Sequence, residues 1–524
     1  MSEDRLTPPP VGEDDAHLRV LGYEEKFERK INLWSNFALG FLYLSPLVGV
    51  IALFSMGLTA AGPPSIFWIV IVAIGQLLVA LVFGEVVSQF PIAGGLYQWA
   101  RRLWSGQYAW ILSWIYIAGV IIGITTTALF SADFVAALLF GSATDPSAAT
   151  TPGEKLAIAL VVAALGLVLN ATGSKTLARI ASIGLAAELI GVIGVGLFLL
   201  IFKRHNSVSV FFDTFGTGSG GYFGAFLAAS LVGLLLFYGF EACGEVAEET
   251  PNPSRVIPRS MQMTVLIGGG SALLAYAGYV LAAPNLEAIV SGDIANPIPT
   301  ILQDTLGIVG TKAFLVVALT SFLACVMGQQ AAASRLVFSF ARDDMFPRSH
   351  WLSQLSSRTK VPVNALVAVN LPPVALFVFV FFEPDSLFRI AAFQMLAGYF
   401  AFQMVVFASI RARRRGWKPG GSWTLGKAGW PVSIAALAYG ILAMILLAKP
   451  TGDPEAPFYD RWIALIGFLV VAAVGLIYQA VAKPHLASNA PEGDAIAVAN
   501  ALRARRENRI PATNSDSPAR IPNA

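Results

Sequence analysis

Several glutamates stand close to a glycine in a largely apolar part of the sequence. Gly239 and Glu241 follow directly on the apolar run 231–237, and Glu248 and Glu249 come about two helical turns later. A carboxylate inside a bilayer is costly unless it faces water or protein, and glycine allows the backbone to leave the helical conformation. Because irregular backbone is tolerated at membrane depth only inside protein or beside a cavity, the stretch predicts a helix broken at a binding site. A continuous helix with a packing glycine and a buried acid is the alternative.

A separate acid, Glu188, lies in the middle of the apolar segment 183–190. Apolar neighbours extend for a full turn or more on both sides, so the carboxylate cannot easily reach the membrane surface. Its placement there costs on the order of 2.5–3.5 kcal/mol, and some compensating interaction is expected. We interpret Glu188 as a coupling residue that takes up and releases a proton. A structural carboxyl, protonated or hydrogen-bonded to a neighbouring helix, is the alternative.

The composition indicates the kind of protein in which these acids lie. Of the 524 residues, 56% are hydrophobic and only 13% are charged, whereas a soluble protein carries about 25% charged residues. We therefore expect an integral membrane protein with about a dozen helices, at roughly 20 apolar residues per crossing. The cysteines lie in apolar segments and the histidines are scattered, so we expect neither a disulfide framework nor a metal site.

Several other functional classes find no support in the sequence. It contains no nucleophile with a partner base and no glycine-rich phosphate-binding loop, so we expect neither an enzyme nor an ATP-driven pump. We expect no cofactor and no nucleic-acid partner. A sensor with the architecture of a transporter is an alternative that the sequence does not exclude. The oligomeric state is not predicted.

The apolar segments divide the chain into a polar N-terminal tail, 1–33, an all-α transporter domain, 34–482, and a disordered C-terminal tail, 483–524. Twelve crossings are expected, at about 35–60, 66–90, 108–139, 154–172, 177–202, 222–249, 258–283, 312–340, 361–382, 386–410, 430–448 and 462–482.

The first crossing contains a second expected break, in the run Ser45-Pro46-Leu47-Val48-Gly49. A simple proline kink is the alternative. Breaks in the first and sixth crossings are five helices apart, and an odd number inverts the second unit relative to the first. The pattern predicts a five-plus-five inverted repeat with the binding site where the broken helices meet. Crossings eleven and twelve lie outside this repeat.

Lysine and arginine are concentrated in the links on one side of the predicted bundle. With the N-terminus inside, these links are cytoplasmic, as the positive-inside rule requires, and both termini are then cytoplasmic. The links contain Arg101, Arg102, Lys175, Arg179, Arg255, Arg259, Arg342, Arg348, Arg358, Lys360 and the basic run 411–418.

Several separate motifs carry a family resemblance. The segment 237–241 (FYGFE), followed by Glu248 and Glu249, resembles the sixth-helix signature of the amino acid–polyamine–organocation superfamily. The segment 334–347, at the end of the eighth crossing, also resembles that superfamily. The segments 33–41, 45–49, 62–63 and 91–99 are similar, more narrowly, to the amino acid/choline permeases, a branch that includes γ-aminobutyrate and choline permeases. The resemblance covers about 30–485 and implies the leucine-transporter-like fold, which the repeat pattern also predicts.

The resemblance implies a place for each end of an amino-acid substrate. The carboxylate would meet backbone N–H groups in the first-helix break, around Ser45, Pro46, Leu47, Val48 and Gly49. This agrees with the preference of helix N-termini for anions.

The resemblance places the ammonium group at carbonyl oxygens in the sixth-helix break, around Phe237, Tyr238 and Gly239. Glu241 matches the acid that helps form the inner gate in relatives. Several relatives carry a lysine at about the position of Glu188, where its charge stands in for a sodium ion. This sequence has an acid there, which puts the lysine-based scheme in doubt.

These observations predict a secondary active permease of the cytoplasmic membrane that moves amino acids or related amines by alternating access. Coupling to protons or exchange of substrates is expected. The alternative is a permease of the same fold for choline, γ-aminobutyrate or polyamines.

Overall fold

The computed structural model describes residues 13–24, 26–142, 150–294, 297–384, 386–449 and 457–507, and their regular secondary structure is helical. Eleven of the described helices are long and apolar enough to span a membrane. These spans are α2 and α3 together (Leu33–Leu44 and Pro46–Ala61), η1 and α4 (Pro63–Ile66 and Phe67–Gln89), α6 (Gly106–Phe140), α7 (Pro152–Ala171), α8, η2 and α9 (Ser174–Leu189, Ile190–Gly194 and Val195–Phe202), α13 (Pro253–Ala282), α15 (Pro297–Arg342), α17 (Val363–Phe382), α18 (Ser386–Arg414), α19 (Gly429–Leu447) and α21 (Ile463–Ala482).

The first span is broken at Ser45, as the sequence predicts. Ser45 has a left-handed backbone (φ 41°), and Pro46 begins α3. Proline has no N–H to donate into the preceding turn and disfavours the α conformation in the residue before it, so α2 ends there. The first turn of α3 therefore starts inside the bundle, where Pro46 and Leu47 are buried.

The sixth predicted crossing is divided into short helices, none of which is long enough to span a membrane. They are α10 (Tyr222–Ala228), α11 (Leu231–Leu234), α12 (Ala242–Glu245) and the 3-10 turn η4 (Ala247–Glu249). The irregular backbone between α11 and α12 contains Gly239 with φ 117°, a conformation that strongly favours glycine. This is the break that the acids and the glycine in the sequence predict.

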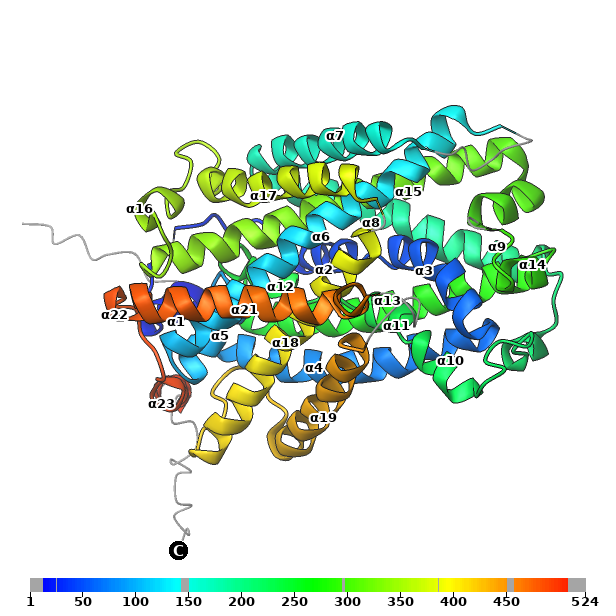
Figure 1. The fold of residues 1–524 in the computed structure, drawn as a ribbon. Helices are drawn as coiled ribbons and strands as arrows, with labels where there is room; N and C mark the ends of the chain where they lie inside the picture. Colours follow the sequence, from blue (N-terminus) through cyan, green and yellow to red (C-terminus); the bar gives the residue numbers. More distant parts are fainter. Residues whose placement is uncertain are drawn as a thin grey trace, which may run out of the picture.

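Helices such as α4, α7, α13, α15, α17 and α21 run along the length of the bundle in Figure 1, whereas α18 and α19 run obliquely to them. The helix α6 packs against α15 and α18, and α13 packs against α4. The helices α7, α17, α19 and α21 lie at the outside and bury a much smaller part of their surfaces than α2, α6 or α18. The buried core therefore surrounds the two broken helices.

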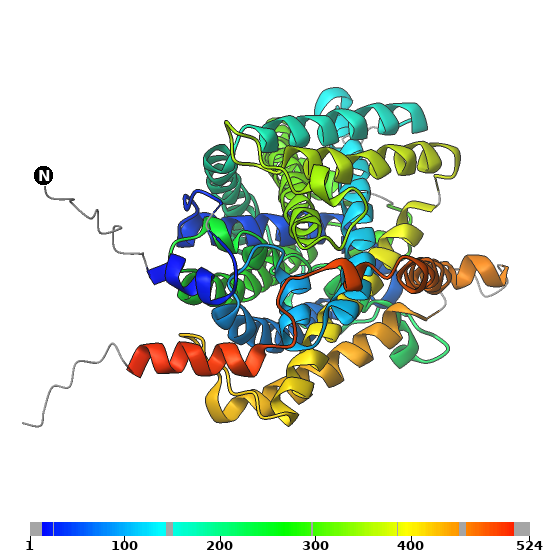
Figure 2. The same cartoon turned by 90° about the vertical axis from the view of Figure 1, so that its left-hand side faces the viewer.

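Both described chain ends lie at the same end of the bundle. The helix α1 (Glu13–Val20), the short helix α5 (Gly95–Leu103) and the segment after α21 gather there, and Figure 2 looks onto this end. Residues 1–12 and 508–524 of the predicted tails lie outside the described residues.

The segment after α21 differs from the predicted disordered tail, because α22 (Pro484–Ala487) and α23 (Ala495–Glu507) are helical. The guanidinium of Arg101 donates to the Ala490 carbonyl oxygen at 2.7 Å, and Gln89 Nε2 donates to the Ala495 carbonyl oxygen at 2.8 Å. The polar composition of the segment suggested disorder, but the acceptors it offers are matched by donors on α4 and α5. The prediction was wrong for this part of the tail.

Glu85, near the end of α4, forms a buried ion pair with Arg413 of α18 and also accepts a hydrogen bond from the Leu425 N–H at 2.9 Å. From its place near the end of the apolar crossing 66–90, next to the basic links, Glu85 is predicted to be a structural acid that pairs with a basic link residue, and the pair with Arg413 confirms this. Together, the ion pair and this hydrogen bond join α4, α18 and the link before α19 at one end of the bundle.

Removing one partner of a buried ion pair leaves an uncompensated charge, at a cost of about 3–5 kcal/mol. We therefore expect Glu85→Ala to lower the melting temperature of the purified protein in detergent. Glu28→Ala is the matched control, because Glu28 pairs with Lys30 on the exposed surface and should shift the melting temperature little. Equal shifts in the two variants would contradict a stabilising role for the buried pair.

Candidate substrate-binding site

A cavity of about 110 Å³ lies where the two broken helices meet. Its wall comes from the first span, the sixth-helix pieces and the facing helices α6, α15 and α18. The lining residues are Tyr43, Leu44, Val48, Gly49, Ala52, Leu53, Met56, Thr126, Thr127, Phe130, Leu231, Leu235, Tyr238, Cys325, Gln329, Ala391, Ala392, Gln394 and Met395.

The wall of the cavity is mostly apolar but holds buried polar atoms without partners. The hydroxyl oxygens of Tyr43 and Tyr238 and the side-chain oxygen of Gln329 are buried and make no hydrogen bond within the described part of the chain. Gln329 Nε2 donates to Thr127 Oγ1 at 3.1 Å, which fixes the direction in which the amide oxygen points. Buried polar groups are normally paired, so these oxygens are available to a ligand.

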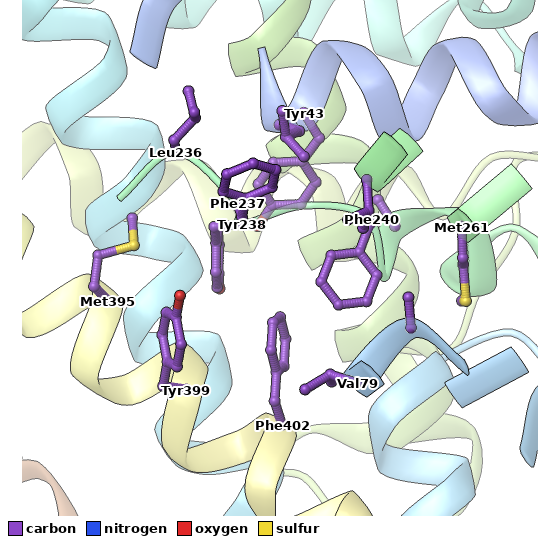
Figure 3. Packing of buried hydrophobic residues seen from close by; sticks show 14 of the residues in the cluster. Tyr43, Val79, Leu236, Phe237, Tyr238, Phe240, Met261, Met395, Tyr399 and Phe402 are labelled. Carbon is purple, nitrogen blue, oxygen red and sulfur yellow. The ribbon is translucent and has the colours of Figure 1, made fainter. Parts of the chain in front are cut away.

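Two tyrosine rings connect the breaks. The rings of Tyr43, from the end of α2, and Tyr238, from the sixth-helix break, meet edge to face with 5.6 Å between their centroids. Tyr238 also stacks on Phe402 of α18 at 5.7 Å. Figure 3 shows these side chains together, with Tyr399 and Met395 of α18 beside them.

The backbones of the two breaks approach each other closely at Gly239. A Cβ atom at this position would lie 2.7 Å from the Leu44 nitrogen and 2.8 Å from the Tyr43 carbonyl carbon. Among the described residues, the carbonyl oxygens of Leu236, Phe237 and Tyr238 accept no backbone hydrogen bond. The break therefore has the unpaired carbonyl groups that the prediction requires for a cation.

Glu241 lies fully buried behind the break rather than in the cavity wall. One carboxylate oxygen accepts a hydrogen bond from the Tyr116 hydroxyl at 2.7 Å, and the other accepts one from the Gly239 N–H at 3.0 Å. Glu241 thus holds the irregular backbone of the break against α6.

Glu188 lies at the first-helix break. Its Oε1 accepts hydrogen bonds from Ser45 Oγ at 2.8 Å and from the Leu47 N–H at 3.0 Å. Its Oε2 is buried and has no partner among the described residues. The compensating interaction that the buried acid requires is therefore the N-terminal end of α3.

The structure separates the predicted site residues into three groups. Val48, Gly49 and Tyr238 line the cavity. Ser45 and Leu47 face Glu188 instead.

Pro46 and Phe237 form the third group, because both lie against the glycines of α13. A Cβ atom on Gly268 would lie 3.7 Å from Pro46, and one on Gly269 would lie 2.8 Å from the Phe237 ring. These two residues shape the breaks without facing the cavity.

Several polar lining residues were not predicted, among them Tyr43, Thr126, Thr127 and Gln394. Thr126 Oγ1 donates to Gln394 Oε1 at 3.0 Å, so α6 and α18 share one polar patch on the cavity wall. The run of three threonines, 125–127, in the middle of an apolar segment was the available signal for α6.

A layer of buried ion pairs closes the bundle on the side of α5 and the chain ends. Arg335 of α15 binds Glu249 with both side chains buried, at 2.5 Å and 3.1 Å, and Arg342 binds Glu248 at 2.9 Å. These pairs connect the end of the sixth-helix pieces to α15.

The N-terminal segment contributes to this layer through Tyr23, whose hydroxyl donates to Asp343 at 3.1 Å. Burial, and next the charge of Asp343, raise the pKa of Tyr23 to about 12. The hydroxyl therefore stays protonated and keeps donating at neutral pH.

An interior cavity at two helix breaks within a bundle of membrane spans is the architecture of a membrane transport protein. The model of the amino acid permease family matches residues 31–474. The chain therefore belongs to the amino acid permease family, whose members are transporters and not enzymes. Membership implies the leucine-transporter-like fold.

Three relatives illustrate the breadth of the family. The chain is 27% identical to an uncharacterized amino-acid permease of Schizosaccharomyces pombe, over 90% of this chain and 87% of the relative. It is 25% identical to a putative polyamine transporter of Candida albicans, over 87% and 85% of the two chains. It is 24% identical to the amino-acid permease BAT1 of Arabidopsis thaliana, over 90% and 94%.

Because backbone atoms of Tyr43 and Leu44 lie so close to Gly239, any side chain at position 239 is expected to push the two helix breaks apart. We expect Gly239→Ala to abolish substrate uptake while the protein still reaches the membrane, and Gly239→Leu to do the same. Gly270→Ala is the matched control, because a Cβ atom on Gly270 in α13 would meet nothing within 4 Å. Normal uptake by Gly239→Ala, measured in proteoliposomes, would remove the break from the site.

Proposed function

We propose that this protein is a secondary active permease that moves amino acids or related amines across the cytoplasmic membrane by alternating access. The observation that carries the proposal is the cavity at the two helix breaks, with its unpaired hydroxyl, amide and carbonyl oxygens. Such a site binds a small molecule by its polar ends and encloses its apolar part.

The proposed architecture has twelve crossings. The pieces α10, α11 and α12 with the irregular backbone between them form the sixth crossing, and the eleven long spans supply the others. The first ten crossings form the inverted repeat, whose second unit starts with the sixth. Both termini lie in the cytoplasm, in keeping with the basic links and with the position of α1 and α23 at one end of the bundle (Figure 1).

In the proposed binding mode, the ammonium group of the substrate lies at the unpaired carbonyl oxygen of Tyr238, the residue of this break that lines the cavity. The tyrosine oxygens of Tyr43 and Tyr238 and the amide oxygen of Gln329 supply further acceptors. The ion-pair layer of Arg335 and Glu249 then acts as the inner gate. It must open for release into the cytoplasm.

Proton coupling is assigned to Glu188. Its Oε1 stays bound to the first turn of α3, while Oε2 is the oxygen on which a proton can be carried. Ionisation of Glu188 therefore changes the charge at the first break, which is one half of the cavity wall. Substrate and proton affect each other through this shared element.

The direct test of the function is uptake into proteoliposomes that contain the purified protein. With an inward proton gradient or with trapped substrate inside, we expect accumulation of radiolabelled amino acids or amines from a mixed panel. Empty liposomes are the control. The absence of gradient-driven or exchange transport for every member of the panel would contradict the proposal.

For the coupling residue, we expect Glu188→Gln to abolish accumulation against a gradient and to remove the pH dependence of uptake. Counterflow exchange should persist, because the amide oxygen can still accept the hydrogen bonds of Ser45 and Leu47. Counterflow and gradient-driven uptake are measured on the same proteoliposomes. Concentrative uptake with an unchanged pH profile would show that Glu188 is structural.

A further inference from the structure

We infer that the substrate of this transporter is an organic amine cation without a carboxylate, because Glu188 occupies the position at which a substrate carboxylate would bind. The inference rests on the proposed function and makes it more specific. It departs from the expectation that the first-helix break receives the carboxylate of an amino acid.

The first turn of α3 offers few free N–H groups. Pro46 has none, the Leu47 N–H donates to Glu188 Oε1 at 3.0 Å, and the Gly49 N–H donates to the Ser45 carbonyl oxygen at 3.0 Å. Among the described residues, the Val48 N–H is the one donor of this turn that is left to a ligand. The Ser45 hydroxyl, which could also serve an anion, donates to Glu188 as well. The protein therefore supplies its own carboxylate to the anion-binding end of the helix.

The rest of the cavity offers no compensating positive charge. All of its lining residues are uncharged. Arg389, which precedes the lining residue Ala391 by two positions, is outside the lining and has an interaction of its own. A substrate carboxylate near Val48 would stand beside the buried carboxyl of Glu188 without a counter-ion, and desolvation and like-charge repulsion both oppose this.

The same wall suits a cation. Tyr43 and Tyr238 line the cavity and their hydroxyl oxygens are buried without partners among the described residues, and aromatic rings attract ammonium groups. The oxygen of Gln329 and the carbonyl oxygens of the sixth-helix break add acceptors without adding donors. The two buried acids nearest the breaks, Glu188 and Glu241, also favour positive charge in the space between them.

Pairs of compounds that differ only by decarboxylation test the inference on the wild-type protein. The pairs are lysine and cadaverine, ornithine and putrescine, and γ-aminobutyrate and propylamine. Binding is measured by the ligand-dependent shift of the melting temperature in detergent, titrated to an apparent Kd for each compound. We expect the amine to bind at least ten-fold more tightly than its parent acid in every pair that binds.

The other outcomes of this comparison distinguish a failure of the inference from a failure of the proposed function. Equal or tighter binding of the amino acids overturns the inference and leaves the proposed permease function intact. If neither the acids nor the amines bind or enter proteoliposomes, the proposed function fails, and the inference fails with it.

A variant links the preference to Glu188. Glu188→Ala frees the Leu47 N–H and the space beside it, so we expect the preference for the amine to fall at least ten-fold within each pair. Glu85→Gln is the matched control, since Glu85 is a buried acid on α4 that pairs with Arg413 outside the cavity. An unchanged preference for the amine in Glu188→Ala would show that Glu188 does not cause this preference. If that variant does not fold, the comparison on the wild-type protein decides the substrate class.

Discussion

The structure depends on the contact between two interrupted helices. Gly239 of the sixth-helix break comes so close to Tyr43 and Leu44 at the end of α2 that no side chain fits between them. This contact brings the free carbonyl groups of one break and the helix N-terminus of the other to the same place. Irregular backbone can exist at this depth because it is enclosed by the surrounding helices and because two glutamates pair part of its polar groups, while the free carbonyl groups lie beside the cavity.

The two glutamates have parallel structural roles at the two breaks. Glu188 on α8 accepts from the backbone and the serine of the first break, and Glu241 accepts from the backbone of its own break and from Tyr116 on α6. Each carboxylate thus replaces a lost helical hydrogen bond. Because Glu188 also fills the anion-binding end of α3, the same interaction that stabilises the break restricts the ligand.

The end of the bundle that holds the chain ends combines apolar packing with buried ion pairs. Arg335 and Arg342 of α15 bind Glu249 and Glu248, and the chain ends lie against the same layer (Figure 2). Ion pairs suit a gate because their partners gain hydration when they separate, whereas separated apolar surfaces do not.

The sequence by itself determined the class of protein, most of the spans, both helix breaks and the pairing of Glu85 with a basic residue, because these follow from local apolar length, proline, glycine and the cost of a buried charge. It did not determine which site residues line the cavity, since the direction of a side chain at a break depends on backbone angles that only the packed neighbours decide. Tyr43 and Gln394 lie far apart in the chain and carried no local signal. The position of Glu188 at Leu47 and Ser45, and the helix α23 in place of a disordered tail, likewise arise from hydrogen bonds between distant segments, which only the tertiary structure decides.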